Sequence, residues 1–190
     1  MDFVGFDEAW KSLAPLNVMR LDSSTEEAFR PGLADSDDLV IFDLCGSTPD
    51  ADTIPLKIPQ DRAADALEAL VHKLHLAPLL LFPIGKWRNV IDSISFELAD
   101  NENWQEMDSA SIVALNTRDP LMCEPQDLHL VHDILATILR IGENPLQGVT
   151  LAALGKPLLI CAEPPDHLRI ELGRESLAAE VRELLEPFAV

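Results

Sequence analysis

An apolar run, Leu79–Phe82, lies between two prolines and follows directly on an amphipathic helical pattern over 59–76. An unbroken series of large apolar residues between Pro78 and Pro83 predicts a short strand that is buried on both faces. The apolar residues of the preceding segment recur at helical spacing, at Leu67, Leu70, Val71 and Leu74. A helix that leads into a buried strand predicts an α/β (or α+β) fold, with a mixed central sheet and helices packed on it.

The other patterns extend this arrangement along the chain, and we expect residues 1–190 to form a single globular domain. Further helices are predicted over 7–13, from Ser24 to a stop at Pro31-Gly32, and over 86–98, 124–141, 146–154 and 175–185. Further strands are predicted over 17–21, 39–44, 53–58, 111–115, 157–161 and 167–172. Pro55 places its strand at an edge of the sheet, and the short turn after 157–161 predicts an antiparallel pair.

Acidic residues outnumber basic ones along the whole chain, with 33 Asp and Glu against 14 Lys and Arg and a formal net charge of −19. Such a surface repels phosphate backbones and anionic membranes, so we expect neither nucleic acid nor a membrane as a partner. Solubility is the simplest explanation of the charge, and attraction of a basic protein partner is the more specific one.

The three cysteines, Cys45, Cys123 and Cys161, are far apart and form no CxxC pair. This pattern is typical of free thiols in a reducing compartment rather than of a disulfide framework. The first residues lack the basic and apolar regions of a signal peptide, and no apolar run approaches the ~18–20 residues of a membrane helix. We therefore expect a cytoplasmic protein.

The stretch LVIFDLCGST, residues 39–48, is an apolar strand that ends in Asp43 and is followed by a glycine and a hydroxyl residue. It resembles the first motif of haloacid-dehalogenase-type phosphatases, in which a strand-end aspartate is the nucleophile and a second aspartate two positions later is the general acid. Asp43 matches the first position, whereas Cys45 occupies the second. No later pair of acids clearly completes a magnesium site, so a strand followed by a turn is the preferred interpretation.

Two histidine pairs have i, i+3 spacing within predicted helices, His72 with His75 and His129 with His132. This spacing puts two imidazoles on one helix face, as a metal site between two helices requires. By helical angle, His75 and His132 flank the apolar stripes, whereas His72 and His129 point nearly to solvent. We expect histidines at helix flanks rather than a metal site, and whether the two pairs converge stays open.

Three of the 14 basic residues lie just beyond two predicted apolar strands. Lys86 and Arg88 follow the first strand, and Arg118 follows the strand predicted over 111–115. If these strands are parallel neighbours, their carboxyl ends lie at one edge of the sheet, where ligands bind in open α/β sheets. The candidate binding residues there are Lys86, Trp87, Arg88, Asn116, Arg118 and Asp119. A helix N-terminus and Arg118 suit an anion, whereas an ion pair of Asp119 with an arginine would make the cluster structural.

No complete catalytic motif is present, since the chain lacks a GxSxG elbow, a P-loop and a dinucleotide fingerprint. We therefore expect a non-enzymatic module that works by protein–protein contact or regulation, with a protein partner or a second copy of the chain. The alternative is a small-anion-binding domain or a hydrolase that uses Lys86, Arg88, Arg118 and Asp119. We expect no metal and no cofactor, and whether the protein is an enzyme stays open.

Overall fold

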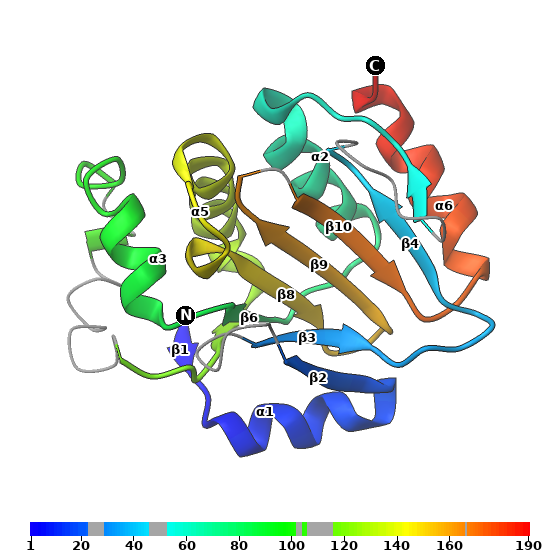
Figure 1. The fold of residues 1–190 in the computed structure, drawn as a ribbon, viewed down its shortest axis with the longest axis horizontal. Helices are drawn as coiled ribbons and strands as arrows, with labels where there is room; N and C mark the ends of the chain where they lie inside the picture. The colour runs from blue at the N-terminus through cyan, green and yellow to red at the C-terminus, as the bar shows by residue number, and fades with distance from the viewer. Residues whose placement is uncertain (23–28, 46–52, 102–103, 106–115, 166) are drawn as a thin grey trace.

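The computed structural model describes residues 1–22, 29–45, 53–101, 104–105, 116–165 and 167–190 (Figure 1). The strands of its central sheet are β1 (Asp2–Phe3), β4 (Val40–Asp43), β5 (Thr53–Pro55), β6 (Leu79–Pro83), β7 (Leu121–Cys123), β8 (Val149–Ala153), β9 (Leu158–Glu163) and β10 (His167–Leu172). Within the described residues these strands form one mixed sheet in the order β1-β7-β6-β8-β9-β10-β4-β5. A separate hairpin consists of β2 (Val18–Asp22) and β3 (Phe29–Leu33).

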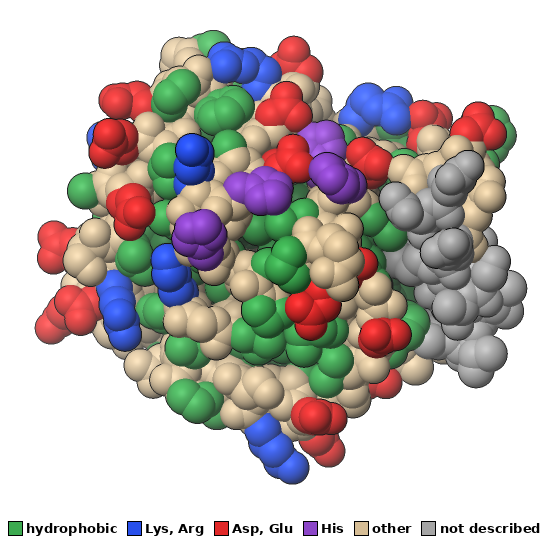
Figure 2. Space-filling model, turned by 180° about the vertical axis from the view of Figure 1, so that it is seen from behind, with side chains coloured by type: hydrophobic (Ala, Val, Ile, Leu, Met, Phe, Trp, Pro, Cys, Tyr) green, Lys and Arg blue, Asp and Glu red, His purple; other side chains and the backbone are tan. Residues whose placement is uncertain are grey.

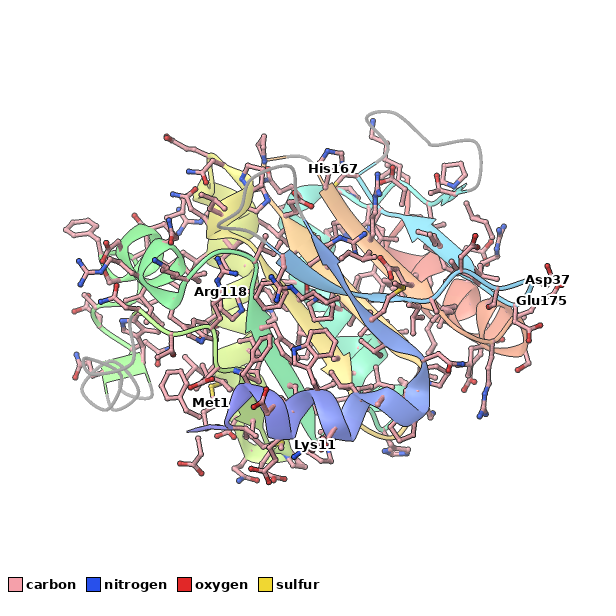
Figure 3. All side chains as sticks on the ribbon, turned by 60° about the horizontal axis from the view of Figure 1, so that its bottom comes forward. Met1, Lys11, Asp37, Arg118, His167 and Glu175 are labelled. Carbon is pink, nitrogen blue, oxygen red and sulfur yellow. The ribbon has the colours of Figure 1, made fainter. Side chains whose placement is uncertain are left out.

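Helices cover both faces of this sheet, which confirms the predicted α/β class. The helices are α1 (Phe6–Leu13), α2 (Gln60–Lys73), α3 (Trp87–Ile94), α5 (Leu128–Ile141) and α6 (Ser176–Leu185). Helices α2, α3, α5 and α6 pack their apolar stripes on one face of the sheet, where they form the main core. Helix α1 and the hairpin cover part of the opposite face, which Figure 3 shows from their side.

Strand β6 lies inside the sheet between β7 and β8, and every one of its residues is buried, as its apolar sequence predicts. Strand β5 lies at an edge, and β9 and β10 pair antiparallel, which confirms both predictions. The parallel neighbour considered for β6 was the strand predicted over 111–115, which lies outside the described residues. The described neighbours of β6, which are β7 and β8, both run antiparallel to it. Among the described strands, the parallel pair is β4 with β5.

The helix predicted over 146–154 is wrong, because only Pro145–Gln147 is helical, as one 3-10 turn, and β8 follows. All residues of β8 are buried between β6 and β9, so contacts on both faces override the helical spacing of its leucines.

The predicted helix stop at Pro31-Gly32 is also wrong, since both residues lie within β3. Among the described strands β3 pairs with β2 alone, so Pro31 costs no ladder bond on a second side. Strand 111–115 lies outside the described residues.

Candidate functional site

The loop after β6 and the loop before β7 meet at the same end of these two neighbouring strands, because the strands run antiparallel. The Trp87 backbone N–H donates to the Thr117 carbonyl oxygen at 3.4 Å, and the Trp87 indole N–H donates to the Asp119 carbonyl oxygen at 2.8 Å. Residues 86–88 and 116–119 are therefore neighbours, as expected from the sequence. The antiparallel pair of β6 and β7 brings them together. The parallel pair considered from the sequence required the strand over 111–115, which lies outside the described residues.

Two of the candidate residues at this edge stabilise the fold. The Trp87 side chain is buried, and its ring meets the Phe3 ring edge to face, with 6.2 Å between the ring centres. The Asp119 carboxylate accepts a hydrogen bond from the Phe6 backbone N–H at 3.0 Å, at the first residue of α1. The first turn of a helix leaves such N–H groups without a partner inside the helix. Asp119 is therefore a cap for α1.

The other four candidates differ in exposure, with Arg88 and Asn116 exposed and Lys86 and Arg118 half-buried. The Arg118 guanidinium carbon lies 5.1 Å from the centre of the Phe29 ring, on the side of the sheet that the hairpin covers (Figure 3). Arg20 contacts the same ring at 4.7 Å. Cation–π contacts of this kind contribute about 0.5–1 kcal/mol at exposed sites. Arg118 therefore helps to pack β3 against the sheet.

A row of polar side chains crosses the sheet on this face. The strand register places Thr150, Cys161, Arg169 and Asp43 side by side on β8, β9, β10 and β4. The buried carboxylate of Glu171, also on β10, accepts hydrogen bonds from Arg30 Nη1 at 2.5 Å and from the Leu33 backbone N–H at 2.9 Å. Both donors lie on β3, so Glu171 ties the hairpin to the sheet.

The thiols of the core are not activated. Burial raises the pKa of Cys161 to about 11, although the Arg30 guanidinium and the Thr150 hydroxyl oppose this shift. Burial likewise raises the pKa of Cys123 to about 12. For Arg30, burial lowers the pKa, but the neighbouring Cys161 and Glu171 outweigh this effect and the pKa is raised overall. Near neutral pH both thiols are protonated and Arg30 is charged, so neither cysteine is a ready nucleophile.

Asp43, which matches the nucleophile of the phosphatase motif, ends β4 and is only 2% exposed. Its Oδ1 accepts a hydrogen bond from the Cys45 backbone N–H at 3.1 Å. Residues 46–48 of the motif lie outside the described residues. A buried carboxylate that accepts from its own turn agrees with the interpretation of a strand followed by a turn.

A groove of about 300 Å³ lies between α2 and α5 on the helical face of the molecule. The two helices run antiparallel, because the Gln60 side chain at the start of α2 donates to the Leu139 carbonyl oxygen near the end of α5. The groove is lined by Gln60, Asp61, Ala64, Asp65, His132, Ala136 and Arg140. Its floor is open because Ala64 and Ala136 have small side chains, and its α2 side carries the carboxylates of Asp61 and Asp65.

Histidines and carboxylates alternate along the seam between α2 and α5, and Figure 2 shows histidine side chains gathered among acidic ones on this side of the molecule. His132 Nε2 lies 2.9 Å from Asp65 Oδ1, and His132 Nδ1 lies 3.2 Å from Asp133 Oδ1. Burial lowers the pKa of His132, but hydrogen bonds to these two carboxylates and the charge of Glu68 outweigh it. The pKa of His132 is therefore raised.

The carboxylate of Glu68 is shared by two more histidines of the seam. Glu68 Oε1 lies 3.8 Å from His72 Nε2 and 3.9 Å from His129 Nδ1. Both rings are exposed, as the helical angles predict. His75 does not continue this face, because α2 ends at Lys73 and His75 follows in a left-handed conformation with φ of 50°. The prediction that His75 flanks the apolar stripe of a helix is therefore wrong.

Within the part of the chain that the structure describes, no three His, Cys, Asp or Glu side chains stand ready to hold a metal ion. No helix of those residues has both the length and the apolar character needed to cross a membrane. Comparison with known proteins finds no matching protein family, no similar curated protein and no similar solved structure.

The groove is the feature that sequence analysis missed. Asp61, Asp65, Glu68 and His72 recur at positions i, i+4, i+7 and i+11, which is a visible stripe on one side of α2. Taken alone, such a stripe indicates only a solvated helix face. Its meaning depends on the facing residues of α5, and the sequence does not state that these two helices pack together.

Proposed function

We propose that this protein is a non-enzymatic binding module that docks a basic segment of a partner protein in the groove between α2 and α5. The supporting observation is that carboxylates border a floor of small side chains. Asp61 and Asp65 supply negative charge, and Ala64 and Ala136 leave room for the methylene stem of a lysine or arginine. Long basic side chains bind in this way, with the stem on apolar surface and the charged end among carboxylates.

The overall charge favours the same kind of partner. A net charge of −19 attracts basic segments over a long range and speeds their association, most strongly at low salt. The groove contains two basic groups, and each of them already has an acidic partner. Arg140 pairs with Glu97 at 2.7 Å, and His132 contacts Asp65 at 2.9 Å. A groove of about 300 Å³ is at the small end of the range for ligand pockets, which suits side chains better than a cofactor.

The alternative, a small-anion site at Lys86, Arg88, Arg118 and Asp119, has weaker support. Asp119 caps α1 by accepting the Phe6 N–H, and Arg118 packs on the Phe29 ring, so both side chains already stabilise the fold. We also propose a cytoplasmic location, which the reduced cysteines Cys45, Cys123 and Cys161 suit.

Binding of short fluorescent peptides rich in Lys and Arg, followed by anisotropy, tests the proposal. Ala136→Trp fills the groove without a change of charge, and we expect it to weaken binding on the order of tenfold or more. The matched control is Ala179→Trp at an exposed position of α6, which should bind as the wild type does. An acidic peptide of the same length should not bind.

Two outcomes would contradict the proposal. If Ala136→Trp and Ala179→Trp bind equally well, the peptide is held by net charge and not by the groove. If no basic peptide binds at millimolar concentration in low salt, a basic segment is not the partner. Sedimentation of the unbound protein separately tests the second-copy alternative, because a dimer through this face would be lost in Ala136→Trp.

A further inference from the structure

One of the side chains that line the groove between α2 and α5 is itself a titratable base. His132 lies on α5, and its Nε2 is 2.9 Å from Asp65 Oδ1 on α2, across the groove. The His132 side chain is 25% exposed and the Asp65 side chain is 63% exposed, so solvent reaches both. One of the two carboxylates that border the groove is therefore already in contact with a group that the protein supplies itself.

Carboxylates from both helices surround the His132 ring. Asp65 contacts Nε2, Asp133 lies 3.2 Å from Nδ1, and the charge of Glu68 acts on the ring from the next turn of α2. Burial lowers the pKa of His132, but these acidic neighbours outweigh burial and the pKa is raised overall. The arrangement therefore favours the protonated ring, which forms an ion pair with Asp65.

The other charged groups of this region keep their charge near neutral pH or lie toward other partners. Asp61 lines the groove one helical turn before Asp65. Arg140 pairs at 2.7 Å with Glu97, from the segment after α3, and His129 lies 3.9 Å from Glu68 Oε1.

His132 is the histidine among the described residues that line the groove. Histidine is the side chain that ordinarily changes its charge between about pH 5 and 8. Near neutral pH, the charge inside the groove is therefore set by the protonation of this one ring.

We propose that His132 controls access to the groove, because its protonated form occupies Asp65 in place of a basic partner and its neutral form leaves the Asp65 charge to that partner. This inference rests on the proposed docking function and adds the regulation of the same groove by pH. A lysine or arginine that enters beside Asp65 repels the protonated ring, so docking favours loss of the His132 proton. Docking and proton release therefore promote each other.

The direction of the effect follows from the raised pKa of His132. The ring is protonated below its usual value of 6.5 and becomes neutral as the pH rises through the folded value. The groove should therefore bind a basic segment weakly in mildly acidic solution and more tightly in mildly alkaline solution. Ion pairs between partly exposed groups are modest, so we expect a change in affinity of about fivefold.

Anisotropy of a fluorescent peptide rich in Lys and Arg, measured at constant ionic strength at about pH 6 and about pH 8, tests the inference. The label blocks the peptide's amino terminus, so no group of the peptide titrates in this range. The wild type should bind about fivefold more tightly at the higher pH. His132→Gln should bind at the lower pH as tightly as the wild type does at the higher pH, because Asp65 has lost its competitor.

His129→Gln is the matched control. His129 lies one turn before His132 on the same helix, is 83% exposed and does not line the groove. The variant should therefore keep the pH dependence of the wild type. An equal loss of pH dependence in both variants would show that the total charge of the histidines matters and not the His132–Asp65 contact, which overturns the inference.

Calorimetry in two buffers of different ionisation enthalpy gives a second readout. At about pH 7, docking of the peptide should release a fraction of a proton from the wild type and none from His132→Gln. Wild-type protein that binds the peptide without proton release, or equally well at both pH values, overturns the control by His132 and leaves the docking proposal standing. A peptide that binds at neither pH overturns the docking proposal and this inference with it.

Discussion

Glu171 and Arg30 form an ion pair that fastens the β2–β3 hairpin to the central sheet, with Arg30 Nη1 2.5 Å from Glu171 Oε1. The Glu171 side chain is only 4% exposed, and its second oxygen accepts the Leu33 backbone N–H at 2.9 Å. One carboxylate thus holds both a side chain and the backbone of β3. A buried charge is tolerated only when it is paired and hydrogen-bonded, so the pair sets where the hairpin lies on the sheet.

Glu171→Ala should lower the free energy of unfolding by about 3–5 kcal/mol, because it leaves the Arg30 charge and the Leu33 N–H without their acceptor. Glu171→Gln keeps an acceptor oxygen and should lose less. Urea unfolding followed by circular dichroism measures both. The control Glu180→Ala, at an exposed position of α6, should stay within about 0.5 kcal/mol of the wild type. A loss from Glu171→Ala as small as that of the control would show that the pair does not hold the hairpin.

Asp119→Ala should lower the free energy of unfolding by about 1 kcal/mol, because the Phe6 N–H at the start of α1 loses its acceptor. Asp119→Asn retains a side-chain oxygen and should recover most of the loss. Urea unfolding measures stability, and titration with inorganic phosphate checks the anion-site alternative in the same samples. Phosphate binding by the wild type that is lost in Arg88→Ala would instead support that alternative.

Most elements of the fold follow from local sequence patterns. Helices α2, α5 and α6 and the buried strand β6 each occur where one apolar stripe or run predicts them, because their spacing matches one regular structure only. The helix prediction over 146–154 is wrong because the leucines of this segment fit a helical stripe as well as a buried strand. Tertiary contacts decide between the two structures. Strands β1 and β7 are too short for any periodic signal.

The candidate sites show a similar limit. Residues 86–88 do meet 116–119 as expected, but through β7, which the sequence did not predict, and the roles of Trp87 and Asp119 were not predictable. Each role depends on a partner from the N-terminal segment, Phe3 in one case and Phe6 in the other. Such contacts between residues more than 80 positions apart in the sequence leave no mark in a local pattern.

His132→Gln should change how stability depends on pH. The pKa of His132 is raised above its usual 6.5 in the folded protein, so its stabilising effect is present below that value and is lost as pH rises through the folded value. The gap in unfolding free energy between wild type and His132→Gln should be largest below pH 6.5 and should shrink as the pH rises above that value. We expect a gap below about 1 kcal/mol.

Urea unfolding at a series of pH values measures this gap. His75→Gln, at an exposed position beyond α2, is the control and should follow the wild-type curve throughout. A gap that grows as pH rises would contradict the arrangement, because it would mean that neutral His132 is the form that the folded state prefers.

The three thiols should react in an order set by burial. Cys45 is half-buried, whereas Cys123 and Cys161 are buried and have pKa values of about 12 and about 11. Iodoacetamide at pH 8 should therefore modify Cys45 in the native protein and reach the other two only in urea. Mass spectrometry of the digested protein measures each site.

The hairpin covers only one of the two buried cysteines. Cys161 lies on the sheet face that Arg30 and β3 cover, whereas Cys123 lies in the core beneath the helices. Glu171→Ala frees the hairpin and should speed modification of Cys161 several-fold while leaving Cys123 unchanged, because local opening exposes only the face that the hairpin covers. Equal acceleration at both cysteines would mean that the variant unfolds as a whole. No acceleration at Cys161 would mean that the Glu171–Arg30 pair does not keep β3 on the sheet.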